Sequence, residues 1–311
     1  MIARTYSLDH IGPGAASLAL LTAALWGGNQ VAIKVGLEGM PPLALAAARF
    51  GIGWVVVAMA AAVTRQPIAL AAGEWKPLAG LCLLFVVQIA TLNIGTLHTS
   101  ASRSIVLISA YPFFTAICAH LLIPGDRLTR RQVAGMALSF TGIMCMFAES
   151  FAWTATQYLI GDAFVLLSAA LLGLRQVVLK RLVAEAHPYK VLYWQALMSL
   201  PVFVGFSLLV EGTAGYEWSW RAAAGVLYQG VVVAGACFII LVFLLSRHSA
   251  GRLGVFGFLT PVVGVALSMW ITGDEPTVGL LGSMALVGFG ILVTQRQSMQ
   301  PAPPPGPPAR R

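Results

Sequence analysis

Residues 23–34 read AALWGGNQVAIK, and residues 169–180, 146 positions later, read AALLGLRQVVLK. Both stretches follow the pattern A-A-L-x-G-x-x-Q-V-x-x-K, with a glutamine in the middle of apolar sequence. Alanine, leucine, valine and glycine agree easily in apolar sequence, so the information lies in Gln30 with Gln176 and in Lys34 with Lys180. The repeated stretch indicates an internal duplication.

The same register continues along both halves of the chain. Pro42 corresponds to Pro188 at the same offset. Further corresponding pairs are Ser100 with Ser249, Arg103 with Arg252, Pro112 with Pro261, Gly125 with Gly273 and Asp126 with Asp274. A colinear set of this kind is hard to obtain by chance, so we expect two copies of one unit.

The composition indicates a membrane protein. Of the 311 residues, 58% are hydrophobic and only 10% are charged, and the mean hydropathy is +0.83. A helix that crosses a bilayer needs about 20 mostly apolar residues, whereas barrel strands are shorter and alternate. The continuous apolar runs therefore predict an all-α integral membrane protein with ten transmembrane helices. The predicted spans are residues 15–37, 42–63, 76–98, 100–122, 132–148, 158–180, 188–210, 222–245, 249–272 and 277–294.

The first apolar run has an alternative interpretation, because it follows Arg4 and resembles a signal peptide. Its polar Gly-Gly-Asn-Gln centre, repeated in part after Ala169, indicates that it stays in the mature protein. We therefore count it as a transmembrane helix.

Basic residues set the orientation, since lysine and arginine are retained on the cytoplasmic side. With ten spans, fourteen of the 19 basic residues fall on the side of the N-terminus. The outer side holds Lys34, Arg49, Arg103 and Arg221, and Arg175 lies inside the sixth span. Both termini are therefore predicted to be cytoplasmic. Basic loops that face anionic lipid also account for the net charge of +8, so no nucleic-acid partner is expected.

A unit of five spans leaves the chain on the opposite side of the membrane, so the second copy enters the bilayer inverted. Inverted repeats are a recurring construction of secondary transporters. The predicted organisation is a cytoplasmic tail (1–14), a first five-helix repeat (15–148), a periplasmic linker (149–157), a second five-helix repeat (158–294) and a disordered, proline-rich cytoplasmic tail (295–311).

Longer stretches carry a family resemblance. Residues 100–147, SASRSIVLISAYPFFTAICAHLLIPGDRLTRRQVAGMALSFTGIMCMF, resemble the end of the first domain in the ten-helix EamA-type branch of the drug/metabolite transporter superfamily. Residues 251–293, GRLGVFGFLTPVVGVALSMWITGDEPTVGLLGSMALVGFGILV, repeat that pattern, and LWGGNQVAIK at 25–34 resembles the first helix of the fold. The family's usual turn glutamate is Asp126 here, which keeps the charge. Within the branch, the chain resembles bacterial amino-acid exporters, including those for aromatic amino acids.

Polar and aromatic residues at helical spacing give candidate substrate contacts. Positions i, i+4 and i+8 share one helix face, so Trp26, Gln30 and Lys34 form a stripe. The candidates for lining a pore are Trp26, Asn29, Gln30, Gln88, Thr91, His98, Ser104, Tyr111, Gln176, Tyr228, Gln229, Phe256 and Thr260. Buried amides also hold membrane helices together, which is the alternative role for the glutamines. Lys34, Arg175 and Lys180 lie near predicted helix ends, where a long basic side chain can reach the headgroups.

Two prolines, Pro112 and Pro261, each remove a backbone hydrogen bond within a predicted span. Each is a candidate hinge for alternating access or a fixed kink that shapes the cavity. The four cysteines lie in apolar runs without a Cys-x-x-Cys pair, so no disulfide or metal site is expected. No cofactor is expected either.

These features predict a secondary transporter that exports small amphipathic metabolites, with amino acids, and aromatic ones in particular, as the favoured class. The alternatives are export of other metabolites or drugs, and an intramembrane enzyme. The sequence contains no H-E-x-x-H, no G-x-S-x-G and no pair of membrane aspartates, so no catalytic residue is expected. Asp and Glu are absent from mid-span, which predicts facilitated diffusion or exchange. We expect a multi-pass monomer in the bacterial cytoplasmic (inner) membrane, with the solute and the lipid bilayer as partners.

Overall fold

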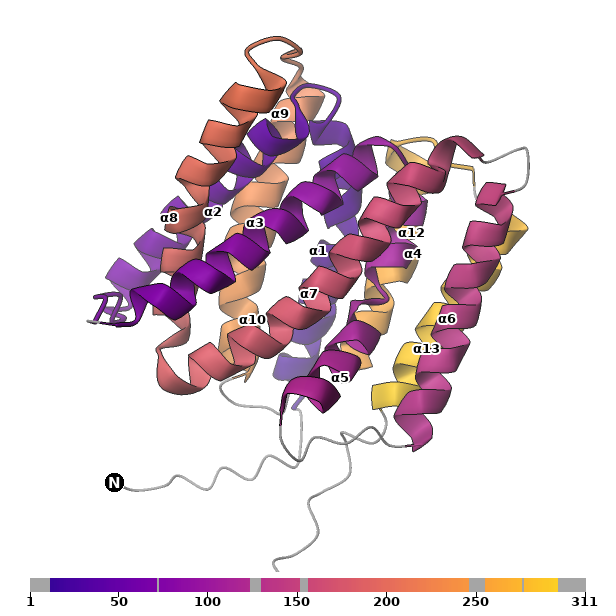
Figure 1. Cartoon of the computed structure of the whole chain (residues 1–311), viewed down its shortest axis with the longest axis horizontal. Coiled ribbons are helices and arrows are strands. Elements are labelled where there is room, and N and C mark those ends of the chain that lie inside the picture. The colour runs from indigo at the N-terminus through magenta and orange to yellow at the C-terminus, as the bar shows by residue number, and fades with distance from the viewer. Residues whose placement is uncertain are drawn as a thin grey trace, which may run out of the picture.

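The computed structural model describes residues 12–71, 73–123, 130–151, 156–245, 255–275 and 277–295. Most of both predicted tails and part of the predicted linker lie outside the described residues. Every regular element in these ranges is a helix, which confirms the all-α prediction (Figure 1). The elements are α1 (Pro13–Gly36), α2 (Pro42–Val63), α3 (Trp75–Leu97), α4 (Ala101–Ile108), α5 (Tyr111–Leu122), α6 (Arg130–Phe151), η1 (Thr156–Tyr158), α7 (Leu159–Glu185), α8 (Pro188–Phe206), η2 (Ser207–Glu211), α9 (Trp220–Leu227), η3 (Tyr228–Cys237), α10 (Phe238–Leu245), η4 (Val255–Phe258), α12 (Leu259–Ile271) and α13 (Val278–Gln295).

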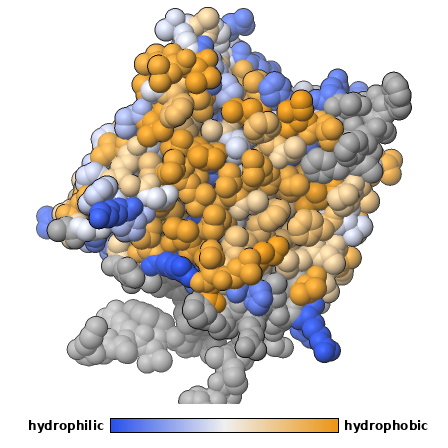
Figure 2. Space-filling view, in the orientation of Figure 1, coloured by the Kyte–Doolittle hydropathy of each residue, from blue (hydrophilic) through white to orange (hydrophobic). Residues whose placement is uncertain are grey.

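The helices present an apolar outer surface. Among the described residues, seven helical segments are long and apolar enough to cross a membrane, and three further apolar helices are shorter. Figure 2 shows apolar side chains across the middle of one face, with hydrophilic residues nearer its edges. Large apolar side chains such as Leu83 and Met144 are about two-thirds exposed, which suits contact with lipid tails. The structure is therefore that of a multi-pass membrane protein.

Two predicted spans are interrupted near their prolines. The span predicted over 100–122 divides into α4 and α5, and Pro112 is the second residue of α5. Pro261 is the third residue of α12, which follows the short 3₁₀ segment η4. Proline lacks an N–H and its ring clashes with the carbonyl four residues earlier, so the helix must break or tighten there. The hinge candidates thus lie in the first turn of a helix that follows an interruption.

Two segments wind more loosely than an α-helix. α8 continues into the π-helical η2, and the π-helical η3 separates α9 from α10. π-helical turns are rare and occur often at functional sites. η3 lies at mid-span, which makes its surroundings a place to look for a binding site.

The two halves of the chain pack against each other through corresponding helices. α1 packs against α12, and its counterpart in chain order, α7, packs against α5. α2 packs against η3, while α3 packs against α8. α6 and α13, the last helices of the two halves, lie side by side (Figure 1). Each of these contacts joins the first half to the second, so the interface between the halves runs through the whole bundle.

The repeated glycine of the A-A-L-x-G motif lies at two of these helix crossings. A Cβ built on Gly27 would lie 2.8 Å from the backbone oxygen of Thr260 in α12. A Cβ on Gly173 would lie 2.6 Å from the backbone nitrogen of Thr115 in α5. Both glycines therefore allow α1 and α7 to approach their partner helices closely.

Candidate functional site

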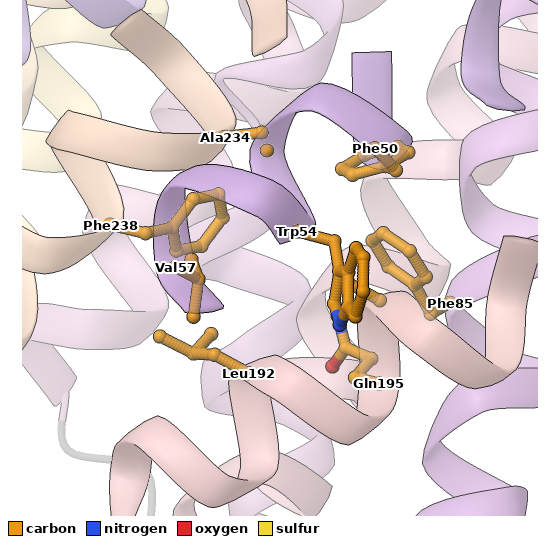
Figure 3. Close-up of a pocket in the computed structure, with 10 residues that line it drawn as sticks. Phe50, Trp54, Val57, Phe85, Leu192, Gln195, Ala234 and Phe238 are labelled. Carbon is orange, nitrogen blue, oxygen red and sulfur yellow. The ribbon is translucent and has the colours of Figure 1, made fainter. Parts of the chain in front are cut away.

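A narrow pocket of about 30 Å³ lies between α2, α3, α8 and the junction of η3 with α10 (Figure 3). Its walls are mostly aromatic and aliphatic. The lining residues are Phe50, Gly53, Trp54, Val57, Phe85, Leu192, Gln195, Ala196, Ala234 and Phe238. An apolar cavity with few polar groups is the usual form of a small-molecule site.

Aromatic rings line the pocket in ordered contact. The ring centroids of Phe50 and Phe85 lie 4.6 Å apart at an angle of 72°, an edge-to-face arrangement. The ring centroids of Trp54 and Tyr193 lie 5.5 Å apart, and Gln195 lies next to Trp54 in the pocket wall (Figure 3). The indole N–H of Trp54 has no hydrogen-bond partner among the described residues. The pocket therefore combines apolar walls with a free donor.

Two arginines lie directly beside this aromatic wall. Arg49 of α2 and Arg175 of α7 are only 4% and 7% exposed. The guanidinium carbon of Arg49 lies 4.4 Å from the ring centroid of Phe50, and that of Arg175 lies 4.9 Å from the ring centroid of Phe85. These are cation–π contacts. Helices of both halves cover the two side chains, so the expectation that Arg175 reaches the headgroups is wrong, while the assignment of Arg49 to the outer side stays a prediction.

Several predicted site residues hold helices together in this conformation. Each donates to or accepts from a neighbouring helix. The hydrogen bonds run from Gln88 Nε2 to Ser168 Oγ (2.9 Å), between Ser104 and Thr96 hydroxyls (2.8 Å), from Tyr228 to the Leu25 carbonyl (2.6 Å), from Gln229 Nε2 to the Ala32 carbonyl (2.9 Å), and from Thr260 to the Ala23 carbonyl (3.1 Å). Such bonds fit the alternative role of polar residues as contacts between helices. A solute contact for these residues stays a prediction.

The two motif glutamines behave differently, since neither hydrogen-bonds to another described residue. Gln30 is 4% exposed and its Oε1 is buried without a partner. Gln176 is half-buried, and Asn29 also has a buried Oδ1 without a partner. These amides do not line the pocket of Figure 3. Their unpaired atoms keep them as candidates for solute contact.

The remaining predicted residues are scattered. Thr91 is buried and bonds to carbonyls of its own helix, whereas His98 is exposed at the end of α3. Tyr111 is half-buried at the start of α5, and Phe256 packs beside Ala19. The ring of Trp26 lies edge-on to Phe238, with centroids 6.1 Å apart, and so adjoins the pocket wall. Of the predicted residues in this group, Trp26 alone is placed beside the pocket.

One end of the bundle is closed by a polar network that joins the two halves. The Lys34 ammonium donates to the carbonyls of Thr96, Leu97 and Thr99 at 2.6–3.0 Å. Arg103 Nε donates to Asp162 Oδ2 at 3.0 Å, and the Thr99 hydroxyl donates to Asp162 Oδ1 at 2.6 Å. Lys180, the motif counterpart of Lys34, is exposed instead. The two motif lysines therefore occupy unlike surroundings in this conformation.

A second carboxylate at this end, Asp274, is held by hydroxyl and amide donors. The backbone N–H and the hydroxyl of Ser102 each donate to Asp274 Oδ2 at 2.8 Å. Burial alone raises the pKa of Asp274, but hydrogen bonds from Ser268, Ser102 and Thr272 outweigh it, so the pKa lies below its ordinary value of 3.8. Asp274 is therefore ionised at neutral pH.

Sequence reasoning missed the residues that form the pocket, among them Phe50, Trp54, Phe85 and Gln195. Phenylalanine is common in membrane helices and carries no polar signal, so a search for polar stripes passes over it. One signal in the sequence did point to this region, namely Arg49 directly before Phe50. An arginine inside an apolar run is costly to bury and tends to be functional.

An apolar multi-helix bundle whose two halves pack together, with a narrow aromatic pocket and a polar network at one end, is compatible with a membrane carrier. Comparison with known proteins specifies the class. A sequence model described as the EamA-like transporter family matches residues 14–148 and again residues 159–296. The chain belongs to this family, a branch of the drug/metabolite transporters, and is not an enzyme.

The relatives have names that describe export. The chain is 28% identical over 289 residues to a "probable amino-acid metabolite efflux pump" of Salmonella typhimurium, covering 89% of this chain and 93% of the relative. It is 26% identical over 287 residues to a "probable terminal-alkyne amino-acid exporter" of Streptantibioticus cattleyicolor, covering 90% and 93%. A solved crystal structure with 18% identity covers 92% of this chain and 99% of its own, with a TM-score of 0.68, which supports the fold.

Proposed function

We propose that this protein exports small amphipathic metabolites across the bacterial cytoplasmic membrane by alternating access, with amino acids as the favoured class and aromatic amino acids foremost. The observation that carries the proposal is the pocket between the two halves that is walled by Phe50, Trp54 and Phe85. In a conformation that widens this narrow pocket, an aromatic side chain can stack on these rings while its polar end meets hydrogen-bond donors. The two relatives named for amino-acid export support the same substrate class.

The proposed architecture is two inverted five-helix repeats with both termini in the cytoplasm. The family model matches the chain twice over similar lengths, at residues 14–148 and 159–296. The exchange of helix partners between the halves, α1 with α12 and α7 with α5, is what an inverted repeat produces. In this scheme the two halves swap conformations to open the pocket to either side, and Pro112 and Pro261 serve as hinges.

The proposed energy source is the gradient of the solute itself. Among the described membrane acids, Asp162 is fully buried, and Arg103 and Thr99 hold it at one end of the bundle. A carboxylate engaged in this way is poorly placed to carry a proton across the membrane. We therefore expect facilitated diffusion or exchange.

A cellular assay tests the proposed export. Cells with and without the chain are fed a phenylalanine dipeptide, and free phenylalanine outside the cells is measured over time. The proposal predicts faster release from cells that express the chain, and slower release again in Gln30→Ala and Gln176→Ala. Gln157→Ala is the matched control, because Gln157 is exposed in η1 and should leave release unchanged.

Equal release with and without the chain, at verified expression in the membrane, would contradict export of phenylalanine. The same assay with other amino acids, and then with other metabolites or drugs, separates the favoured substrate class from the broader alternative.

A further inference from the structure

We infer that Arg49 and Arg175 form a binding site for the carboxylate of the transported solute. The inference rests on the proposed transport function and specifies the part of the solute that the protein recognises. It is carried by the position, the burial and the unmet hydrogen-bonding needs of the two side chains.

The two arginines and two phenylalanines form a continuous cluster. Arg49 lies over Phe50, Phe50 contacts Phe85 at 4.6 Å, and Arg175 lies over Phe85. Each guanidinium group thus lies over one of two rings that contact each other. Since Phe50 and Phe85 also line the pocket, a solute ring held there would have its polar end beside two cations.

Among the acids whose side chains the structure describes, no carboxylate neutralises this pair. Each of these acids is engaged elsewhere or lies exposed in a loop. Glu38 pairs with Arg221, Glu74 with Lys190 and Asp162 with Arg103, Glu211 accepts from the backbone of Leu43 and Ala44, Asp274 accepts from Ser102, and Glu217 and Glu275 are exposed. A buried charge is costly unless an opposite charge or hydrogen bonds compensate it. Two buried cations without a counter-charge indicate an anionic ligand.

The hydrogen bonds point to the same kind of ligand. Arg49 donates once, from Nη1 to Gln229 Oε1 at 3.0 Å, and its Nε has no partner. Arg175 makes no hydrogen bond or ion pair with any described residue, and its Nε is also buried without a partner. Together with the indole N–H of Trp54, three unpaired donors surround one aromatic wall. An acceptor-only group such as a carboxylate satisfies such a set.

Arginine suits this task better than lysine. The guanidinium group is planar, stays charged and offers a fork of N–H donors that matches the two oxygens of a carboxylate. It also stacks on aromatic rings, as both arginines do here. The sequence therefore supplies the side chain that can remain charged inside the bundle and bind a planar anion.

The test compares L-phenylalanine with L-phenylalanine amide, which keeps the ring and the ammonium group but lacks the carboxylate. Each is titrated into the purified full chain in chloride-free buffer while tryptophan fluorescence is recorded, and each is assayed for counterflow in proteoliposomes. We expect the acid to bind at least ten-fold more tightly than the amide. Arg49→Gln and Arg175→Gln should each abolish this difference.

Arg221→Gln is the matched control, because Arg221 is half-exposed and pairs with Glu38 outside this cluster. It removes one positive charge and should keep the ten-fold preference. Arg175→Lys preserves the charge but not the planar fork, and should retain only part of the preference.

Equal binding of acid and amide to the unaltered protein would overturn the inference without any variant, even if counterflow of phenylalanine is intact. A preference that survives both glutamine variants would overturn it as well. Chloride is added to the same buffer as a separate titration. If chloride binds in an arginine-dependent way and phenylalanine does not displace it, the site holds an inorganic anion and the inference is wrong. Propionate and benzoate, which carry a carboxylate without an amino group, are titrated in the same way. If they bind in an arginine-dependent way while phenylalanine shows no counterflow, the proposed amino-acid transport fails and the anion site remains.

Discussion

At the scale of single residues, the duplicated glycine determines how closely two helix pairs approach. Gly27 faces backbone atoms of Thr260 and Gly264 in α12, so a side chain there has no flexible neighbour to displace. A Cβ built on Gly264 would in turn lie 2.7 Å from the carbonyl oxygen of Gly27. The crossing is thus built from small residues on both helices, as close packing in membranes requires.

Replacing Gly27 with alanine should therefore destabilise the fold. The added methyl would lie 2.8 Å from the Thr260 carbonyl oxygen, and overpacking of this kind costs about 1–3 kcal/mol. Thermal unfolding of the purified protein in detergent measures the effect. Gly80→Ala is the control, since an added Cβ there meets nothing within 4 Å. Equal losses in both variants would refute the close crossing.

Asp274 gives a prediction in pH. Its folded pKa lies below 3.8, so its hydrogen bonds stabilise the protein fully above that ordinary pKa, and this stability is lost as the pH falls through the lower folded value. Asp274→Asn should lower the melting temperature at pH 7. The gap between the two proteins should narrow as the pH drops below 3.8. A gap that stays constant down to the acid limit of the assay would contradict an ionised Asp274.

At the scale of elements, buried polar contacts fix the helices of one half against those of the other. Arg103 of α4 reaches Asp162 near the start of α7, and the side chains are 6% and 0% exposed. Lys34 of α1 covers carbonyls at the end of α3, which would otherwise lack donors at the helix terminus. These contacts close the bundle at one end, so they must weaken when that end opens.

Asp162→Asn should therefore cost about 3–5 kcal/mol, because it leaves the buried Arg103 without its counter-charge. Glu38→Gln is the control. Its pair with Arg221 spans 3.5 Å at 44% and 46% exposure, and exposed pairs contribute about 0–1 kcal/mol. Chemical denaturation in mixed micelles compares the two variants. Similar losses would show that the Arg103–Asp162 pair is not a buried tie between the halves.

At the scale of the whole molecule, hydropathy predicted most of the helices and gave no indication of the pocket. The span predicted over 42–63 coincides with α2 (Pro42–Val63). Its ends could be predicted because the apolar run is bounded on both sides by residues that interrupt it. The span over 100–122 was predicted as one continuous helix, whereas the structure divides it between Ile108 and Tyr111, next to the Pro112 that the sequence had marked as a hinge or a fixed kink.

The pocket could not be predicted, for a different reason. It depends on which helices of the two halves meet, and the contact of Phe50 with Phe85 and Phe203 joins three helices that are separated in the sequence. Arg49 and Arg175 were assigned to boundaries because a single chain pattern does not reveal burial by other helices. The close helix approaches at Gly27 and Gly173 were not predicted either, because glycine agrees easily in apolar sequence and the two positions were set aside for that reason.

The most direct test of the central claim is counterflow by the purified chain in proteoliposomes. Vesicles loaded with unlabelled phenylalanine, tryptophan or tyrosine are placed in the matching labelled amino acid, and empty vesicles serve as the reference. We predict transient, saturable accumulation of label that does not follow an imposed pH gradient when the membrane potential is clamped. Absence of counterflow for every amino acid, from protein shown to be folded, would contradict the account.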